Sequence, residues 1–239
     1  DYIGVIFGRD LVWDKSKNSE NLASNSGYQP IVMRSWGGSK PNWPGDVAID
    51  ETRGYLYVSQ ALDNVVAQFD IINLQNGRPK FLRFLGHEGG GELEFRFPHG
   101  IDTDASGNLY IVDSRNHRVQ KISPTGTFLA QWGIRGRTEG QFLYPYAIAV
   151  DKVKNYVYVT DVFNERVQIF TTGGVFVTSF GSWQPLSSGA KQAKDASNIA
   201  GILAHDNEIH LVAGEPRAGL EIYNFPRPQR VVRFKMNLP

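Results

Sequence analysis

The sequence predicts an all-β protein, a β-propeller, and two observations carry that prediction. First, three stretches of the chain repeat one pattern: WPGDVAIDETRGYLYV at 43–58, FPHGIDTDASGNLYIV at 97–112 and YPYAIAVDKVKNYVYV at 144–159. Second, each copy divides into about four short alternating segments separated by turn residues, and no stretch has a convincing helical period. Four strands in every ~45–50 residues is the pattern of a propeller blade, in which radial repetition protects the strand edges.

The copy at 97–133 defines the expected elements most clearly. Its hairpin turns are expected at 105–108 and 123–126, since Gly and Asn tolerate a positive φ and Pro presets its own φ for a turn. Leu-Tyr-Ile-Val at 109–112 suits a pleated surface that is buried on both sides. The four strands of this copy are expected at 99–103, 109–113, 118–122 and 128–132.

Composition narrows the classes of function. The chain has 239 residues, 41% of them hydrophobic, which is enough to bury a core. Its 25 Lys and Arg against 24 Asp and Glu give a net charge of +1, whereas binding a phosphate backbone needs a concentrated basic face. The absence of cysteine excludes disulfides, thiolate zinc sites and a cysteine nucleophile. No apolar run is long enough to span a membrane, so we expect a soluble protein.

Each copy continues with a polar turn: VDSRNHRVQKI at 112–122, TDVFNERVQIF at 160–170 and, more loosely, SQALDNVVAQF at 59–69. These motifs resemble the NHL-type β-propeller, whose blades carry a Pro-x-Gly start and a Val-x-Asp-x-x-Asn-x-Arg-Val turn. We expect a structural role, in which the Asp accepts hydrogen bonds from turn N–H groups and the Arg pairs with a carboxylate on a neighbouring blade. The matching residues are Asp113, Asn116, Arg118 and Val119, and then Asp161, Asn164, Arg166 and Val167.

A second resemblance concerns the order of the blades. GVIFGRDLVWD at 4–14 is similar to the opening blade of peptidyl-α-hydroxyglycine α-amidating lyases, and 201–225 is similar to an irregular blade of that family. The resemblance implies a six-bladed plan with about five blades present in one domain, 1–239, and a sixth blade supplied by sequence outside this chain or by another chain. The blades are expected at about 1–37, 38–86, 87–133, 134–181 and 182–235.

The lyase resemblance also implies a site. In that family a zinc ion on the central channel is held by histidines of the second, fourth and sixth blades, and here the first two of those positions are Gly45 and Tyr146. Arg115 stands at or next to the position of the catalytic tyrosine, and Arg9 matches the arginine that holds the substrate carboxylate. His99, in FPHG, has the ligand motif in the third blade and is a candidate metal ligand, for zinc or calcium.

These departures favour a binding or scaffold propeller with a protein or peptide partner. The alternative is a metal-dependent lyase that cleaves peptidyl-α-hydroxyglycine to an amide and glyoxylate, with Arg9 on the substrate and His99 in a relocated metal site. Family resemblance would place such a protein in a secreted or lumenal compartment, which the residues themselves leave open. Two long polar loops, 14–30 and 182–198, are further candidates for partner contact.

A second alternative is an RNA-binding propeller. It depends on a modest basic cluster, which acidic residues in equivalent or adjacent loops offset, so we do not expect nucleic acid to be the main partner. The basic residues are Arg115, Arg118, Arg135 and Arg137, and the acidic ones are Glu88, Glu92, Glu94 and Glu139.

Overall fold

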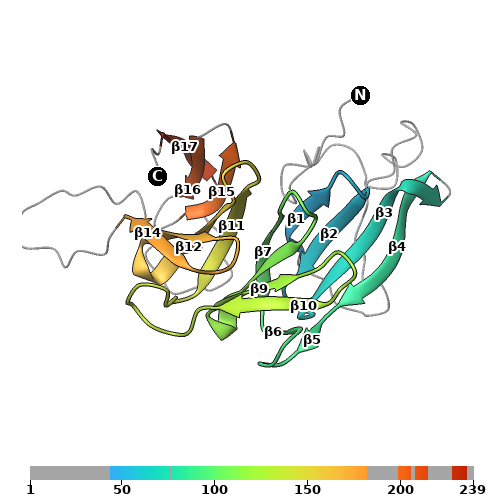
Figure 1. Cartoon of the computed structure of the whole chain (residues 1–239), viewed down its shortest axis with the longest axis horizontal. Coiled ribbons are helices and arrows are strands. Elements are labelled where there is room, and N and C mark those ends of the chain that lie inside the picture. Colours follow the sequence, from blue (N-terminus) through green and yellow to red (C-terminus); the bar gives the residue numbers. More distant parts are fainter. Residues whose placement is uncertain (1–43, 76, 182–198, 206–207, 215–227, 236–239) are drawn as a thin grey trace, which may run out of the picture.

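The computed structural model describes residues 44–75, 77–181, 199–205, 208–214 and 228–235, and Figure 1 shows their arrangement. Their regular elements are β-strands, apart from two 3-10 turns, Ser114–Asn116 and Val162–Asn164. The all-β prediction is therefore confirmed. Within the described ranges no helix is long or apolar enough to cross a membrane.

Three four-stranded antiparallel sheets follow one another along the chain, and a three-stranded sheet comes after them. We name the first three by their residues, the 44–85, 98–132 and 145–180 blades. The 44–85 blade consists of β1 (Pro44–Asp50), β2 (Tyr55–Gln60), β3 (Val65–Gln75) and β4 (Arg78–Leu85). The 98–132 blade consists of β7 (Pro98–Thr103), β8 (Leu109–Asp113), β9 (Arg118–Ile122) and β10 (Phe128–Trp132).

The 145–180 blade has the same plan. It consists of β11 (Pro145–Asp151), β12 (Tyr156–Asp161), β13 (Arg166–Thr171) and β14 (Phe176–Phe180). The last sheet consists of β15 (Ile199–His205), β16 (Glu208–Gly214) and β17 (Pro228–Lys235). A short parallel pair, β5 (His87–Glu88) and β6 (Glu94–Phe95), lies in the loop that enters the 98–132 blade.

The strands expected in the 98–132 blade are confirmed, with β7 beginning one residue earlier than expected. Its two hairpin turns also form as expected. Gly107 and Gly126 have φ of 78° and 87°, a left-handed conformation that glycine adopts without strain. The N–H of Gly107 donates to the carbonyl of Asp104 and that of Gly126 to the carbonyl of Ser123, each at 2.9 Å.

The blades stand side by side with their first strands innermost. β1 contacts β7, β7 contacts β11, and β11 contacts β15. At Gly100 the approach is so close that a Cβ would lie 2.6 Å from the carbonyl oxygen of Tyr146. This radial order of inner strands is the order expected of neighbouring propeller blades.

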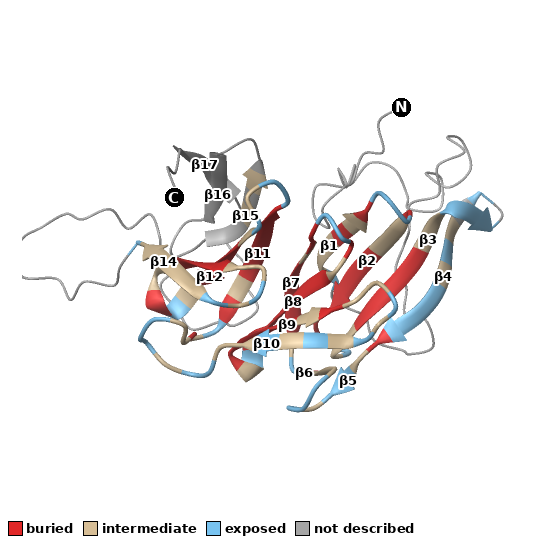
Figure 2. Ribbon diagram, in the orientation of Figure 1, coloured by how far each residue is buried: buried red, intermediate tan, exposed pale blue. Residues whose placement is uncertain are grey.

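Apolar side chains fill the spaces between successive blades. Figure 2 shows the burial concentrated in the inner and middle strands, whereas the outer strands β4 and β10 are mainly intermediate or exposed. The period-2 pattern of the strands supplies side chains to both neighbours of each sheet, because alternate residues face opposite sides. The cluster between the 44–85 and 98–132 blades consists of Ala48, Tyr57, Val66, Leu85, Phe95, Ile101, Leu109, Ile111 and Ile122.

Candidate functional site: the loop face

One end of the blades gathers two kinds of connection. Each blade turns there from its second strand to its third, and each loop that joins two blades arrives there. The N–H of Ser114 donates to the carbonyl of Phe97 (3.3 Å), and the N–H of Phe163 donates to the carbonyl of Leu143 (3.2 Å). We call this end the loop face. Within the described part of the chain it consists of residues 60–65, 86–98, 113–118, 133–145 and 161–166.

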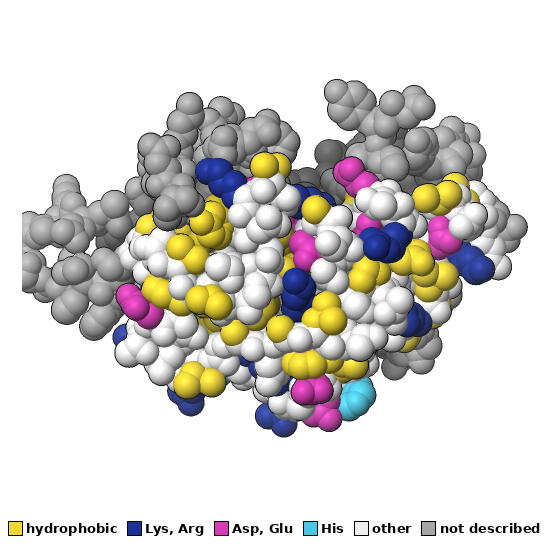
Figure 3. All heavy atoms as spheres, viewed as in Figure 1, with side chains coloured by type: hydrophobic (Ala, Val, Ile, Leu, Met, Phe, Trp, Pro, Cys, Tyr) yellow, Lys and Arg dark blue, Asp and Glu magenta, His cyan; other side chains and the backbone are white. Residues whose placement is uncertain are grey.

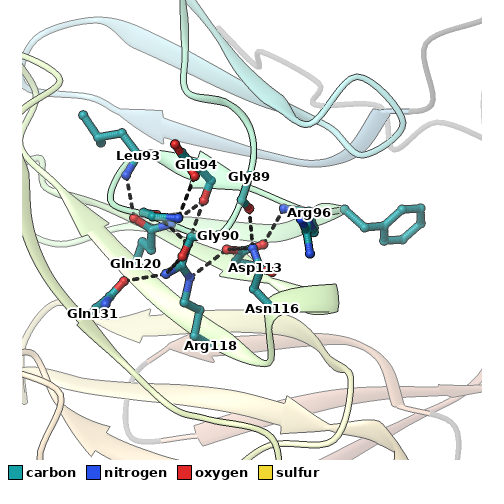
Figure 4. Close-up of polar contacts among 12 residues, drawn as sticks. Gly89, Gly90, Leu93, Glu94, Arg96, Asp113, Asn116, Arg118, Gln120 and Gln131 are labelled. Carbon is teal, nitrogen blue, oxygen red and sulfur yellow. Dashed lines mark hydrogen bonds and ion pairs between the residues drawn. The ribbon is translucent and has the colours of Figure 1, made fainter.

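A buried ion pair fixes the loop that enters the 98–132 blade. The Nε of Arg118 donates to the Oδ2 of Asp113 at 2.8 Å, and both side chains are buried. The two terminal nitrogens of the same guanidinium donate to the carbonyls of Gly90, Gly91 and Glu94 at 2.7–2.8 Å, as Figure 4 shows. One arginine therefore binds three carbonyl groups of this loop, whose own strands, β5 and β6, are two residues long.

The carboxylate of Asp113 holds the other end of that loop. Its Oδ1 accepts the N–H of Arg96 at 2.7 Å, and its Oδ2 accepts the Nδ2 of Asn116 at 2.9 Å. Burial raises the pKa of this carboxyl, and the hydrogen bonds from Arg96, Asn116 and Arg118 act in the opposite direction.

The same clamp recurs in the 145–180 blade. Arg166 Nε donates to Asp161 Oδ2 at 2.9 Å, and its Nη2 donates to the carbonyls of Thr138 (2.7 Å) and Gln141 (2.8 Å). The Oδ1 of Asp161 accepts the N–H of Leu143 at 2.7 Å. We use the word clamp for this Asp–Arg pair together with the loop groups that it binds.

The structure corrects the expectation for these motif residues. In the two clamps each Arg pairs with the Asp of its own turn rather than with a carboxylate on the neighbouring blade. Each Asp accepts a backbone N–H from the entering loop in addition to the side chains of its own turn. The loop that enters the 98–132 blade forms just the short β5–β6 pair, so its carbonyl groups are available to the guanidinium, and charge-assisted hydrogen bonds of this kind are stronger than neutral ones.

One equivalent position in the turns of the three blades is open to solvent. Two residues after the second strand ends, the three blades present Leu62, Arg115 and Phe163. Leu62 is 45% exposed and Phe163 is 52% exposed, and Arg115 is also exposed. An apolar, a basic and an aromatic side chain thus occupy one structural position, which indicates that the fold does not dictate the residue there.

Aromatic rings connect this turn position to the start of the inner strands. The guanidinium carbon of Arg115 lies 5.0 Å from the ring centre of Phe97. Phe97 is stacked on His99 at 6.2 Å, and His99 is stacked on Tyr146 of the next blade at 3.7 Å. The row runs from the open turn of one blade to the innermost strand of its neighbour.

A second aromatic row crosses the boundary between the 98–132 and 145–180 blades. Tyr144, 42% exposed, packs edge-on against His117 (4.8 Å) and against Phe163 (5.2 Å). The N–H of Tyr144 also donates to the Nδ1 of His117 at 3.1 Å. Burial lowers the pKa of His117, and the nearby Arg135 lowers it further, so the ring is held in the neutral form that accepts this bond.

This link across the blade boundary is itself repeated. At the equivalent position of the 44–85 blade, Asn64 Oδ1 accepts the N–H of Phe97 at 2.9 Å. Asn64 and His117 both have a left-handed backbone, with φ of 58° and 56°. The same hydrogen bond therefore joins successive blades through an amide in one case and an imidazole in the other.

The three residues compared with the lyase ligand positions lie on adjacent inner strands. Gly45, His99 and Tyr146 are equivalent residues of three blades and lie next to one another, since a Cβ on Gly45 would be 3.2 Å from the His99 ring. His99 is 7% exposed, and burial lowers its pKa to about 3. Asp46, which follows Gly45, accepts the N–H of Ile101 at 3.2 Å, and burial raises its pKa to about 7.

The metal assignment stays a prediction. Among the described residues no group of three or more His, Cys, Asp or Glu side chains is placed to hold a metal ion. Arg9 and the two long loops at 14–30 and 182–198 lie outside the described residues.

The basic cluster is smaller than the sequence suggests. Arg118 is buried in its clamp and offers no charge to solvent. On the side of the described surface shown in Figure 3, the Lys and Arg side chains lie apart from one another among white, yellow and magenta atoms.

The aromatic residues of the loop face were missed by sequence reasoning, which assigned no role to Phe97, Tyr144 or Phe163. A signal for part of this set exists, because the fourth residue of each polar turn differs in every copy, whereas the Asn, Arg and Val that follow it recur in the turns at 112–122 and 160–170. Apart from the Phe97–His99 pair, the contacts in the two aromatic rows join residues 18 to 47 positions apart and depend on how the loops fold.

Comparison with known proteins agrees with both resemblances. The NHL repeat model matches residues 95–122. Over 98 residues the chain is 33% identical to the protein brain tumor of Drosophila melanogaster, a match that covers 41% of this chain and 10% of that protein. Over 191 residues it is 27% identical to peptidyl-glycine alpha-amidating monooxygenase A of Xenopus laevis, covering 70% of this chain and 20% of the relative.

The chain thus spans a tenth to a fifth of the length of these relatives. Among solved structures, it superposes on Kuenenia stuttgartiensis hydrazine synthase with a TM-score of 0.53 at 11% identity, covering 76% of this chain and 45% of that one. That likeness supports the fold alone. The chain carries an NHL repeat in an NHL-type β-propeller, and its sequence is related to both named proteins.

Proposed function

We propose that this propeller is a binding module that holds a protein or peptide partner on its loop face. The observation that carries the proposal is that each of the two clamped turns combines a buried ion pair with one exposed side chain. The Asp113–Arg118 and Asp161–Arg166 pairs are buried and hold the loops. Two residues after the Asp of each pair, the side chain is exposed, and it is Arg115 in one turn and Phe163 in the other. Loops fixed on a rigid scaffold are where binding residues concentrate.

The exposed side chains are of the kinds that dominate protein interfaces. Aromatic residues and arginine contribute most of the binding free energy in such interfaces. Tyr144 and Phe163 pack against each other on this surface, and Arg115 is exposed at the equivalent turn of the neighbouring blade. Because the clamps already order the loops, a partner would meet a surface whose backbone needs little further ordering, which lowers the entropic cost of association.

The geometry offers less support for catalysis. Gly45 supplies no side chain, Tyr146 is stacked on His99, and Arg115 lies over Phe97. We therefore base no second function on these positions, and a lyase assay enters as a control.

The test is a quantitative pull-down. The full chain, a Tyr144→Ala/Phe163→Ala variant and a Val153→Ala control are immobilised, and proteins retained from an extract of the source cells are quantified. Val153 is 88% exposed and lies at the opposite end of β12 from Phe163. We expect a protein that is retained by wild type and by the control and lost from the double variant.

That protein is then purified and its affinity for each variant is measured. An affinity unaffected by the double variant would contradict the proposal, as would turnover of a peptidyl-α-hydroxyglycine substrate by the same preparation without any retained partner. Thermal unfolding of the three proteins checks that each is folded.

A further inference from the structure

We infer that the loop face recognises an acidic peptide segment that also carries an aromatic or long aliphatic side chain. The inference rests on the proposed function and goes further, because it names the chemistry of the partner. Three features support it: unpaired arginines, the separation of the two signs of charge, and the orientation of the rings.

Three exposed arginines surround the end of the 98–132 blade. The ion pairs of the described residues engage Arg53, Arg118, Lys121 and Arg166, so within these residues Arg96, Arg115 and Arg135 have no carboxylate within 4 Å. The main chains of Arg96 and Arg115 are adjacent, since the backbone N–H of Arg115 donates to the carbonyl of Arg96 at 3.0 Å.

Arg135 belongs to the same neighbourhood, because it closely follows Gly133, where a Cβ would lie 3.0 Å from the carbonyl oxygen of His117 on the adjoining turn. Guanidinium groups bind carboxylates through paired hydrogen bonds, and a planar group already held over a ring loses less freedom on binding. Arg115 is held in this way by Phe97.

Most carboxylates of the loop face either form hydrogen bonds within it or lie toward the outer strands. Asp113 and Asp161 are buried in the clamps, and Glu94 accepts the N–H of Gly91 at 2.7 Å. The exposed acids Glu88 and Glu92 flank the glycines that Arg118 binds.

That point of the loop lies above the outer part of the blade, because the same guanidinium reaches Gln131 on the outermost strand β10 at 2.7 Å. Glu139 is placed likewise, beside the Thr138 carbonyl that Arg166 binds. Most acidic groups therefore lie toward the rim, where Arg135 occupies the position equivalent to Glu88, whereas Arg96 and Arg115 lie toward the inner strands.

Some acids remain near the turns. Asp63 is exposed beside Leu62, and Glu165 is partly exposed beside Phe163. Both belong to the turns of the flanking blades, so the basic part of the face is bounded on two sides and fits a short segment rather than an extended anionic chain.

The rings distinguish a peptide from single-stranded nucleic acid. Bases stack on open, flat aromatic faces presented in succession. Here Arg115 covers Phe97, and Tyr144 meets both His117 and Phe163 at interplanar angles of 77–79°. Because these aromatic rings meet edge to face, they suit the insertion of a single apolar side chain, such as Phe or Leu, better than a run of stacked bases.

The test uses a phage-displayed library of random peptides selected on the full chain, and then a fluorescein-labelled synthetic copy of the most enriched peptide. We expect enrichment of Asp and Glu together with Phe, Tyr, Trp or Leu. The Arg115→Glu substitution should lower the affinity of the chain for the synthetic peptide about tenfold or more, which is the scale of one lost charge-assisted contact. Lys152→Glu, an exposed charge change on the β11–β12 turn at the other end of the blades, should change the affinity less than about twofold.

Selected peptides without acidic residues would overturn the inference, and so would equal binding to wild type and to Arg115→Glu. Tighter binding of a fluorescein-labelled oligouridine, with a steep loss at high salt, would assign the face to nucleic acid instead. If the pull-down partner is confirmed while the library yields neutral or basic peptides, this inference fails and the proposed function stands. If both experiments fail, the loop face is not a binding surface.

Discussion

The 44–85 and 98–132 blades share one strand register but differ in the chemistry of one turn. Pro44 pairs with Gln60 and Gln60 with Val65, as Pro98 pairs with Asp113 and Asp113 with Arg118. Both blades have an irregularity at the same place in the first strand pair. Yet Gln60 and Val65 cannot form the ion pair that their counterparts form.

This difference between the two blades identifies the structural role of the Asp–Arg motif. A four-stranded sheet with the same register forms without it, so the motif does not specify the blade. It instead satisfies the backbone groups of the loop that precedes the blade and thereby fixes the neighbouring exposed turn residue in place. The motif fixes the loops of the loop face, and the proposed function assigns the specificity of that face to the exposed residue between the members of each pair.

The largest expected effect comes from removing one member of a clamp. Asp113→Ala leaves the Arg118 charge buried without a counterion, and we expect a loss of about 3–5 kcal/mol in the free energy of unfolding. Gln60→Ala, at the equivalent position without an ion pair, should cost about 1–3 kcal/mol, the scale of a lost uncharged buried polar group. Urea unfolding of both variants measures the two losses in the free energy of unfolding. Equal losses would show that the ion pair stabilises the fold no more than an uncharged side chain at the same position does.

The next effect concerns the close approach of two inner strands. Gly100→Ala places a methyl group against the backbone of Tyr146 and Ala147, which should force the two blades apart at a cost of about 1–3 kcal/mol. Gly90→Ala is the matched control, because a Cβ there meets nothing within 4 Å. Thermal unfolding that ranks the two variants in the reverse order would contradict the packing described for β7 and β11.

A smaller effect distinguishes the two kinds of inter-blade link. His117 has a pKa below its ordinary value of 6.5 in the folded chain, so between these two values the unfolded chain binds more protons. The contribution of His117 to stability should therefore rise with pH through that window and fall as pH drops below about 6.5, whereas Asp46, whose pKa burial raises to about 7, contributes in the opposite direction. The charges that face the ring are those of Arg135, Asp161 and Asp113.

His117→Asn reproduces the amide link found at Asn64 and should reduce this acid sensitivity while changing stability near pH 8 by less than about 1 kcal/mol. Part of the slope should remain, because His99 also has a lowered pKa, of about 3. Urea unfolding between pH 4.5 and 8 is the measurement. An unchanged pH slope in the variant would mean that His117 does not carry the sensitivity.

The smallest effect is expected at the open turn position. Leu62→Arg copies Arg115 into the 44–85 blade, and an exposed substitution of this kind should alter the free energy of unfolding by no more than about 0.5 kcal/mol. A loss comparable to that of Asp113→Ala in the same unfolding assay would show that the position is structural rather than open to variation.

The repeated pattern predicted the fold well because strand period, turn glycines and a regular spacing all agree in the 98–132 blade. The partners of Arg118 were not predictable, since they are carbonyl groups, which every residue carries, on a loop 24 to 28 positions away. The burial of His99 depends on Tyr146 in the next blade. Contacts between blades follow from packing, which one sequence does not display.

The central claim is that the loop face is the binding surface, and site-specific photo-crosslinking tests it most directly. A benzophenone amino acid replaces Phe163 in one full-length protein and Val153, at the opposite end of β12, in another. After irradiation in the same extract, we expect a discrete cross-linked product from position 163 and none from position 153. A product of equal yield from both positions, or from position 153 alone, would contradict it.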